Sequence, residues 1–277
     1  MTYLNLDNLR NQVNEELLSI YKSGPKSLVK PINYVLSGKG KRLRPELSFL
    51  AANACNGNAE DALPVALAVE ILHNFTLVHD DIMDDDSTRH GKPTVHQKWD
   101  DGTAILTGDA MLSLALMTLQ KCHRNNQKIL KVFTDGLLAV CEGQAIDKEF
   151  ETQKLVSVED YIKMIDLKTG YLIGMAAELG ALSITENEEY CIALREYGYI
   201  VGRAFQIQDD LLELYSNAKQ MGKSLDSDYL LGKKTYPLLK IKEQYNQELA
   251  SAIKVAGNNV KLGKELIRGI LEKTGIK

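Results

Sequence analysis

Hydrophobic residues recur every three or four positions along almost the whole chain of 277 residues. This spacing is typical of one face of an α-helix, whereas the strict alternation of a half-buried strand is not found. Residues 9–21 form one such stripe, and residues 63–72 are apolar on most sides, which predicts a buried helix. The pattern predicts further helices over residues 103–119, 130–150, 158–182, 188–215, 236–246, 247–256 and 260–274.

Turn-forming residues mark the breaks between these helices, as at Ser37-Gly38, Asn56-Gly57-Asn58 and Gly91-Lys92-Pro93. No linker rich in Pro, Gly or Ser divides the chain, and no sequence repeat of fixed period is present. We therefore predict an all-α fold, with a single domain over residues 1–277 built as a bundle of roughly ten helices.

Composition narrows the function classes. Hydrophobic residues make up 44% and charged residues 25%, which is ordinary for a globular protein. A net charge of -4 argues against a nucleic-acid partner. The N-terminal residues 1–11 are polar and no run of eighteen apolar residues exists, so we expect a cytoplasmic location and no membrane span. The cysteines are too widely spaced for a zinc site: Cys55, Cys122, Cys141 and Cys191.

An acidic cluster interrupts one apolar helix pattern at Asp80, Asp81 and Asp84. Positions four apart lie on the same face of a helix, so Asp80 and Asp84 are expected to point the same way. Mg²⁺ is held in proteins by such carboxylates together with substrate phosphates. A solvated acidic helix end has the same sequence, because like charges at this spacing cost only about 0.2–0.5 kcal/mol.

A second cluster repeats the arrangement and favours the metal interpretation. Asp209 and Asp210 are adjacent, and Glu213 follows four positions after the first, again within an apolar helix. Two such clusters on long helices can face each other across a helical bundle. Their summed negative charge would then require cations.

Several basic segments are candidates for binding anions. A dense loop over residues 39–45 precedes a helix, Arg89 follows the first acidic cluster, and Lys168 lies on another helix. Lys223 and Lys233 follow the second cluster. Arginine suits phosphate oxygens bidentately, and lysine serves as a point charge. Each alone is more often a surface residue, but together they indicate two anion-binding regions, one with metal and one without.

With these segments in place, the chain resembles the trans-polyprenyl diphosphate synthases, a family that includes farnesyl and geranylgeranyl diphosphate synthases. The resemblance runs from the first basic loop to Lys233, and its motifs occur in the family's order at residues 40–45, 73, 80–84, 168–169 and 205–210. It implies an isoprenoid synthase fold, a helical bundle around a central cavity. It also implies a homodimer that uses Mg²⁺ as cofactor, about three ions with substrate bound.

The resemblance assigns the metal and allylic residues. Asp80 and Asp84 would bind Mg²⁺ with support from Asp81, and Asp209 and Asp210 would serve a further ion. The allylic diphosphate would be held by Arg89, Lys168, Lys223 and Lys233.

The resemblance also assigns the extender and the reacting centre. Lys41, Arg44 and His73 would hold isopentenyl diphosphate, with Phe205 beside its isopentenyl group. His90 stands where the family usually has a second arginine for the same substrate, so we expect weaker binding of this substrate. Lys168, Thr169 and Gln206 would line the reacting centre.

The resemblance implies ionisation of the allylic diphosphate, condensation and loss of a proton, with the released diphosphate as the base. Product length would be set by a floor at Phe75, next to the small residue Thr76, which predicts a farnesyl or geranylgeranyl product. Two alternatives remain open at this point. A class I terpene cyclase shares the scaffold but does not need Lys41, Arg44 and His73. A non-catalytic regulatory paralogue would accommodate the unusual residues at positions 90 and 213.

Overall fold

The computed structural model describes residues 4–38, 40–215, 234–257 and 259–275, and most of these lie in helices. The elements are α1 (Leu6–Ser19), α2 (Lys26–Leu36), α3 (Leu43–Ala54), the 3₁₀ turn η1 (Ala59–Ala62), α4 (Leu63–Met83), β1 (Thr88–Arg89), β2 (Lys92–Pro93), α5 (Val95–Lys98), α6 (Asp101–Leu119), α7 (Asn126–Thr152), α8 (Val158–Ile165), the π-helical turn η2 (Asp166–Gly170), α9 (Tyr171–Leu182), α10 (Glu188–Tyr215), α13 (Tyr236–Gln244), α14 (Asn246–Ala256) and α15 (Val260–Thr274). The all-α prediction is confirmed.

The predicted helices agree with the observed ones except at one place. Residues 188–215 coincide with α10, whereas residues 158–182 do not form one helix. The π-helical turn η2 separates α8 from α9 there. Single π-turns within helices occur frequently at functional sites. This one carries Lys168 and Thr169.

The loop after α4 contains a short hairpin that the periodicity did not predict. β1 and β2 pair antiparallel, with Thr88 opposite Pro93 and Arg89 opposite Lys92. The two residues of the turn, His90 and Gly91, have φ angles of 51° and 74°. A two-residue hairpin turn of this kind needs the left-handed region at both positions, which glycine adopts without strain.

Helices α4 and α6 supply much of the main hydrophobic core. Residues Ala59–Met83 and Asp101–Leu119 are each long and apolar enough to cross a membrane, although neither contains eighteen consecutive apolar residues. Of the apolar window, 61% in the first segment and 44% in the second is buried inside the bundle. Packing in a protein core therefore accounts for much of their apolar character.

Glycines let the helices around η2 approach closely. A Cβ added at Gly202 of α10 would lie 2.7 Å from the Cα of Gly170 in η2. One added at Gly143 of α7 would lie 2.4 Å from the backbone nitrogen of Lys168. Both distances are below van der Waals contact, so a side chain at either position would force the helices apart. These contacts hold η2 between α7 and α10.

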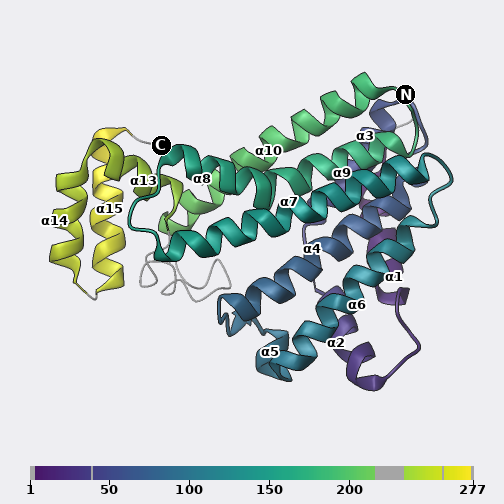
Figure 1. The fold of residues 1–277 in the computed structure, drawn as a ribbon, viewed down its shortest axis with the longest axis horizontal. Helices are drawn as coiled ribbons and strands as arrows, with labels where there is room; N and C mark the ends of the chain where they lie inside the picture. Colours follow the sequence, from purple (N-terminus) through teal and green to yellow (C-terminus); the bar gives the residue numbers. More distant parts are fainter. Residues whose placement is uncertain (1–3, 39, 216–233, 258, 276–277) are drawn as a thin grey trace.

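The C-terminal helices α13, α14 and α15 gather at the end of the elongated molecule opposite the N terminus (Figure 1). A separate small hydrophobic cluster joins them to the end of α10; its buried members are Leu214, Ile241, Leu249, Ile267 and Leu271. The end of α10 is thus fixed by packing, just beyond the second acidic cluster.

Candidate active site

The first acidic cluster lies at the carboxyl end of α4, where Asp84 is the C-cap residue. Burial raises the pKa of Asp80, as does the nearby charge of Asp84, while the ammonium of Lys168 opposes the shift. A carboxylate that is partly buried beside a like charge is stabilised in its ionised form by an added positive charge. Asp80 is therefore suited to binding a cation.

Asp81 points away from this pair toward the hairpin. Its Oδ1 accepts a hydrogen bond from Nε of Arg89 at 2.6 Å, and Nη2 of Arg89 lies 3.6 Å from Oδ2 of Asp86. The tight turn at residues 90–91 thus brings Arg89 back over the end of α4. Asp81 thus holds this arginine in place beside the other carboxylates of α4.

Lys168 lies opposite, on the π-helical turn. Its Nζ donates to Oδ2 of Asp147 on α7 at 2.7 Å. Burial by itself would lower the pKa of Lys168, but the carboxylates of Asp80 and Asp147 outweigh it and raise the pKa overall. Lys168 is therefore a permanent cation that faces the carboxylates of α4.

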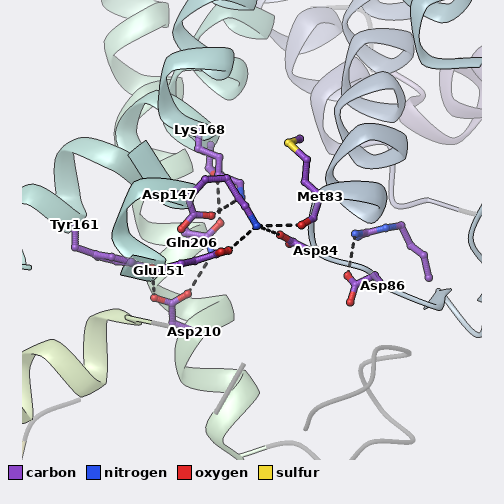
Figure 2. Close-up of polar contacts among 12 residues, drawn as sticks. Met83, Asp84, Asp86, Asp147, Glu151, Tyr161, Lys168, Gln206 and Asp210 are labelled. Carbon is purple, nitrogen blue, oxygen red and sulfur yellow. Dashed lines mark hydrogen bonds and ion pairs between the residues drawn. The ribbon is translucent and has the colours of Figure 1, made fainter. Parts of the chain in front are cut away.

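A chain of hydrogen bonds connects η2 to the second acidic cluster (Figure 2). Oγ1 of Thr169 donates to Oε1 of Gln206 at 2.9 Å, and Nε2 of Gln206 donates to Oδ1 of Asp210 at 3.1 Å. Oδ2 of Asp210 accepts from the hydroxyl of Tyr161 and from the backbone N–H of Tyr236. Burial raises the pKa of Asp210, and these hydrogen bonds oppose the rise. Asp210 thus links the side chains of Gln206 and Tyr161 to the backbone at Tyr236.

Arg44 and His73 form a second, positively charged region. Burial lowers the pKa of Arg44, and the charges of Glu70 and Asp209 oppose the shift. Its buried Nε finds no hydrogen-bond partner among the residues described. A partly buried guanidinium whose buried Nε donor is unused indicates a site for an anion.

Burial lowers the pKa of His73 well below 6.5, and so do the charges of Arg44, Arg89, Arg42 and His90. His73 is therefore neutral at pH 7, surrounded by cationic groups. The structure brings the predicted extender residues Arg44, His73 and His90 within electrostatic range of one another. Lys41 is exposed at the same loop.

Arg42, the remaining arginine of this basic loop, has a structural role. Its Nη1 contacts Oε1 of Glu70 at 2.5 Å, and its other donors reach Asn14 and the carbonyl oxygen of Gly38. The backbone at Arg42 has φ 54°, immediately before α3. Arg42 thus holds the basic loop in shape, and Arg44 of the same loop keeps an unused donor.

Phe75 and Thr76 lie on different faces of α4. Thr76, four residues before Asp80, shares its face, and its hydroxyl donates to the carbonyl oxygen of His73 at 2.8 Å. Phe75 is roughly 140° around the helix from Asp80. Its buried ring packs edge-on against His79 at 4.7 Å between centroids, and Nε2 of His79 lies 3.3 Å from the Ile105 carbonyl oxygen of α6. Phe75 therefore packs against the side chain that contacts α6.

Sequence reasoning missed the polar face of α7. Asp147 binds Lys168. Lys148 contacts the end of α4 and pairs with Glu151. The buried amide of Gln144 has neither its nitrogen nor its oxygen hydrogen-bonded within the described part of the chain. These residues interrupt the apolar pattern at three- and four-residue spacing, which was the available signal. Phe205 is partly buried beside Gln206. Lys223 and Lys233 lie outside the described residues.

The carboxylates fit Mg²⁺ as an ion whose coordination is completed by phosphate oxygens and water. Within residues 4–38, 40–215, 234–257 and 259–275, no three His, Cys, Asp or Glu side chains form a metal-binding group on their own. Mg²⁺ is usually held by one or two carboxylates plus phosphate oxygens and water. The partly buried Asp80, whose pKa is raised, and its neighbour Asp84 match that requirement.

Comparison with known proteins identifies the family. Residues 25–270 match the polyprenyl synthetase family model. A geranylgeranyl diphosphate synthase of Methanosarcina mazei is 42% identical over 224 residues, which cover 80% of this chain and 68% of that protein. A short chain isoprenyl diphosphate synthase of Methanocaldococcus jannaschii is 40% identical, over 82% of this chain and 70% of that one.

Solved structures agree with this result. One geranylgeranyl pyrophosphate synthase superposes with a TM-score of 0.90 at 39% identity, covering 99% of this chain and 86% of its own. That of Pyrococcus horikoshii gives a TM-score of 0.86 at 37% identity, covering 96% and 83%. The chain therefore belongs to the polyprenyl synthetase family and is a trans-prenyltransferase.

Proposed function

We propose that this protein condenses isopentenyl diphosphate with an allylic diphosphate (dimethylallyl, geranyl or farnesyl) and releases diphosphate, giving farnesyl or geranylgeranyl diphosphate. The observation that carries the proposal is the presence of two unlike regions for anions. One combines the Asp80–Asp84 carboxylates with Lys168 and Arg89; the other consists of Arg44 with neutral His73. A reaction that joins two diphosphates needs both.

The allylic diphosphate belongs at the first region. Lys168 and Arg89 would bind its oxygens, and Asp80 and Asp84 would hold Mg²⁺ against them, with Asp209 available to a further ion. When bound, Mg²⁺ would supply Lewis-acid assistance to the departure of diphosphate. Lys168 adds a fixed positive charge where negative charge develops on the leaving group, which lowers the barrier to ionisation.

The reacting carbon then lies near Thr169 and Gln206. The hydrogen bond between them fixes the orientation of the Thr169 hydroxyl on η2 and of the Gln206 amide on α10. Oxygen dipoles placed in advance stabilise the allylic cation without reorganisation. The isopentenyl double bond attacks this cation, a carbon–carbon bond forms, and the proton lost from the adduct passes to the released diphosphate.

The product length follows from the residues between α4 and α6. Phe75 is buried there and supported by His79, so a growing chain that reaches this ring must stop. Proteins named geranylgeranyl diphosphate synthase and farnesyl diphosphate synthase are both among the relatives, at 42% and 40% identity. These names support a short-chain product and leave both lengths within the proposal.

We further propose a cytoplasmic homodimer. Helix α6 exposes Ile105, Leu106 and Met117, more than half of the last two side chains by area. Apolar groups of this size on one helix are typical of a surface covered by another subunit. Light scattering coupled to gel filtration should give twice the chain mass of 30.9 kDa.

The two regions can be tested separately. We expect Arg44→Met to raise KM for isopentenyl diphosphate about tenfold or more, since it removes a charge-assisted contact. KM for geranyl diphosphate should stay unchanged. Arg10→Met, on the surface beside Glu46, is the control and should change neither constant. An equal rise in both KM values would mean a single shared anion site, as in a terpene cyclase, and would contradict the proposal.

A further inference from the structure

Lys148 of α7 occupies a position that the proposed chemistry does not use. Its ammonium lies at the carboxyl end of α4, close to Met83, Asp84 and Glu151, three residues that Figure 2 labels. Nζ donates to the carbonyl oxygen of Met83 at 3.0 Å and to Oε1 of Glu151 at 2.7 Å, and it lies 3.7 Å from Oδ1 of Asp84. A lysine ammonium has three donors, and three acceptors surround this one.

Both the charge and the helix geometry favour a cation at this point. The carboxyl end of a helix carries partial negative charge, so a positive group beside the Met83 carbonyl is stabilised. The side chain of Asp84 is only 13% exposed, and that of Lys148 is 35% exposed. Their attraction is therefore weakened by solvent but not abolished.

We propose that Lys148 is the resident counter-cation of Asp84 and that it lowers the affinity of this carboxylate for a divalent metal ion. This inference rests on the proposed role of Asp84 in binding Mg²⁺. A metal ion that approaches Asp84 meets a positive charge 3.7 Å from the carboxylate oxygen. Glu151 and the Met83 carbonyl retain the ammonium when it leaves Asp84, so the exchange does not strand a buried charge.

The neighbouring residue shows why this position matters. Asp147 directs its carboxylate to Lys168, on the other side of the carboxylates of α4. Consecutive residues of α7 thus act on two of the cationic groups beside the metal site, Lys168 and Lys148. Asp147 holds one in place for substrate, and Lys148 itself competes with the metal.

The test measures metal binding rather than turnover. Free Mn²⁺ is followed by electron paramagnetic resonance in titrations of the full chain at constant ionic strength. We expect Lys148→Met to tighten Mn²⁺ binding about fivefold, the effect of removing a partly screened ion pair. Glu151→Gln should weaken binding, because the ammonium then has only Asp84 as a charged partner. The double variant should match Lys148→Met, since Glu151 acts through the lysine.

Lys131→Met is the matched control. It also removes one lysine of α7, where Nζ pairs with Asp135 at 2.5 Å away from this site, and it should leave the Mn²⁺ affinity unchanged. Unchanged or weaker Mn²⁺ binding by Lys148→Met would overturn the inference and leave the lysine as a cap of α4. If the wild-type chain itself binds no Mn²⁺, the metal site of the proposed function is wrong, and the Lys148 inference is wrong too. This result differs from an unchanged affinity of Lys148→Met, which overturns the Lys148 inference alone.

Discussion

Oγ1 of Thr169 donates a hydrogen bond to Oε1 of Gln206 at 2.9 Å, although the two residues are 37 positions apart. The contact exists because Gly202 of α10 lies against Gly170 of the π-helical turn without intervening side chains. Thr169 and Gln206 belong to separate motifs in the sequence. The helix crossing makes them one unit of the reacting centre.

Breaking this contact should slow the chemical step. Thr169→Val keeps the shape of the side chain and removes the donor, so Gln206 loses its partner. The loss of one such hydrogen bond is worth about 1–1.5 kcal/mol, which corresponds to roughly tenfold in kcat. Steady-state kinetics with geranyl diphosphate measure the change. Thr134→Val on the exposed face of α7 is the control, and a kcat for Thr169→Val that equals it would rule out the role.

Product length should respond to Phe75. Phe75→Ala removes the ring that packs against His79 and opens the space beside α6, so the product should become longer. Mass spectrometry of the dephosphorylated products gives the distribution. Phe133→Leu, another fully buried aromatic position, should leave the distribution unchanged. An identical product from Phe75→Ala would mean that the floor lies elsewhere.

The stability of the ligand-free protein should fall on mild acidification, in part because of His73. Its folded-state pKa lies well below 6.5, so the unfolded chain binds the proton at a higher pH than the folded chain does. The His73 contribution is therefore fully present above about pH 6.5 and is lost as the pH falls toward the lowered pKa. Urea unfolding of His73→Gln should show a flatter pH dependence in that window. The same slope as the wild type would exclude His73 as the source.

Two glycines should respond oppositely to alanine. A Cβ at Gly180 of α9 would lie 2.2 Å from the carbonyl oxygen of Ser48 on α3, so Gly180→Ala should destabilise the fold by about 1–3 kcal/mol. Gly269 of α15 has nothing within 4 Å of the same position, and Gly269→Ala should stabilise by about 0.5–1 kcal/mol. Thermal unfolding measures both. A neutral Gly180→Ala would show that α3 and α9 can separate without cost.

Much of the helical framework could be predicted from periodicity, because each helix buries one apolar stripe. The π-helical turn could not, since residues 158–182 keep the helical period through it. It depends on close packing against Gly143 and Gly202, which is tertiary information. The hairpin at Arg89 was marked only by its Gly91 turn.

The residues of the candidate site were likewise only partly predictable from the sequence. The acidic clusters and Lys168 were identifiable as charges on predicted helices, and Arg44 as part of the basic loop at residues 39–45. Arg42 lies in the same basic loop as Arg44, and only the structure shows that its guanidinium is hydrogen-bonded to Glu70 and Asn14. The polar spacing of α7 includes Lys148, but only the structure shows that its ammonium lies at the end of α4, 65 residues earlier.

The most direct test is turnover by the purified chain. Isopentenyl diphosphate is supplied with dimethylallyl, geranyl or farnesyl diphosphate and Mg²⁺, and the products are resolved by mass spectrometry. We expect a trans-prenyl diphosphate of farnesyl or geranylgeranyl length, and no product when EDTA replaces Mg²⁺. Cyclised hydrocarbons, or no product with any of the three starters, would contradict it.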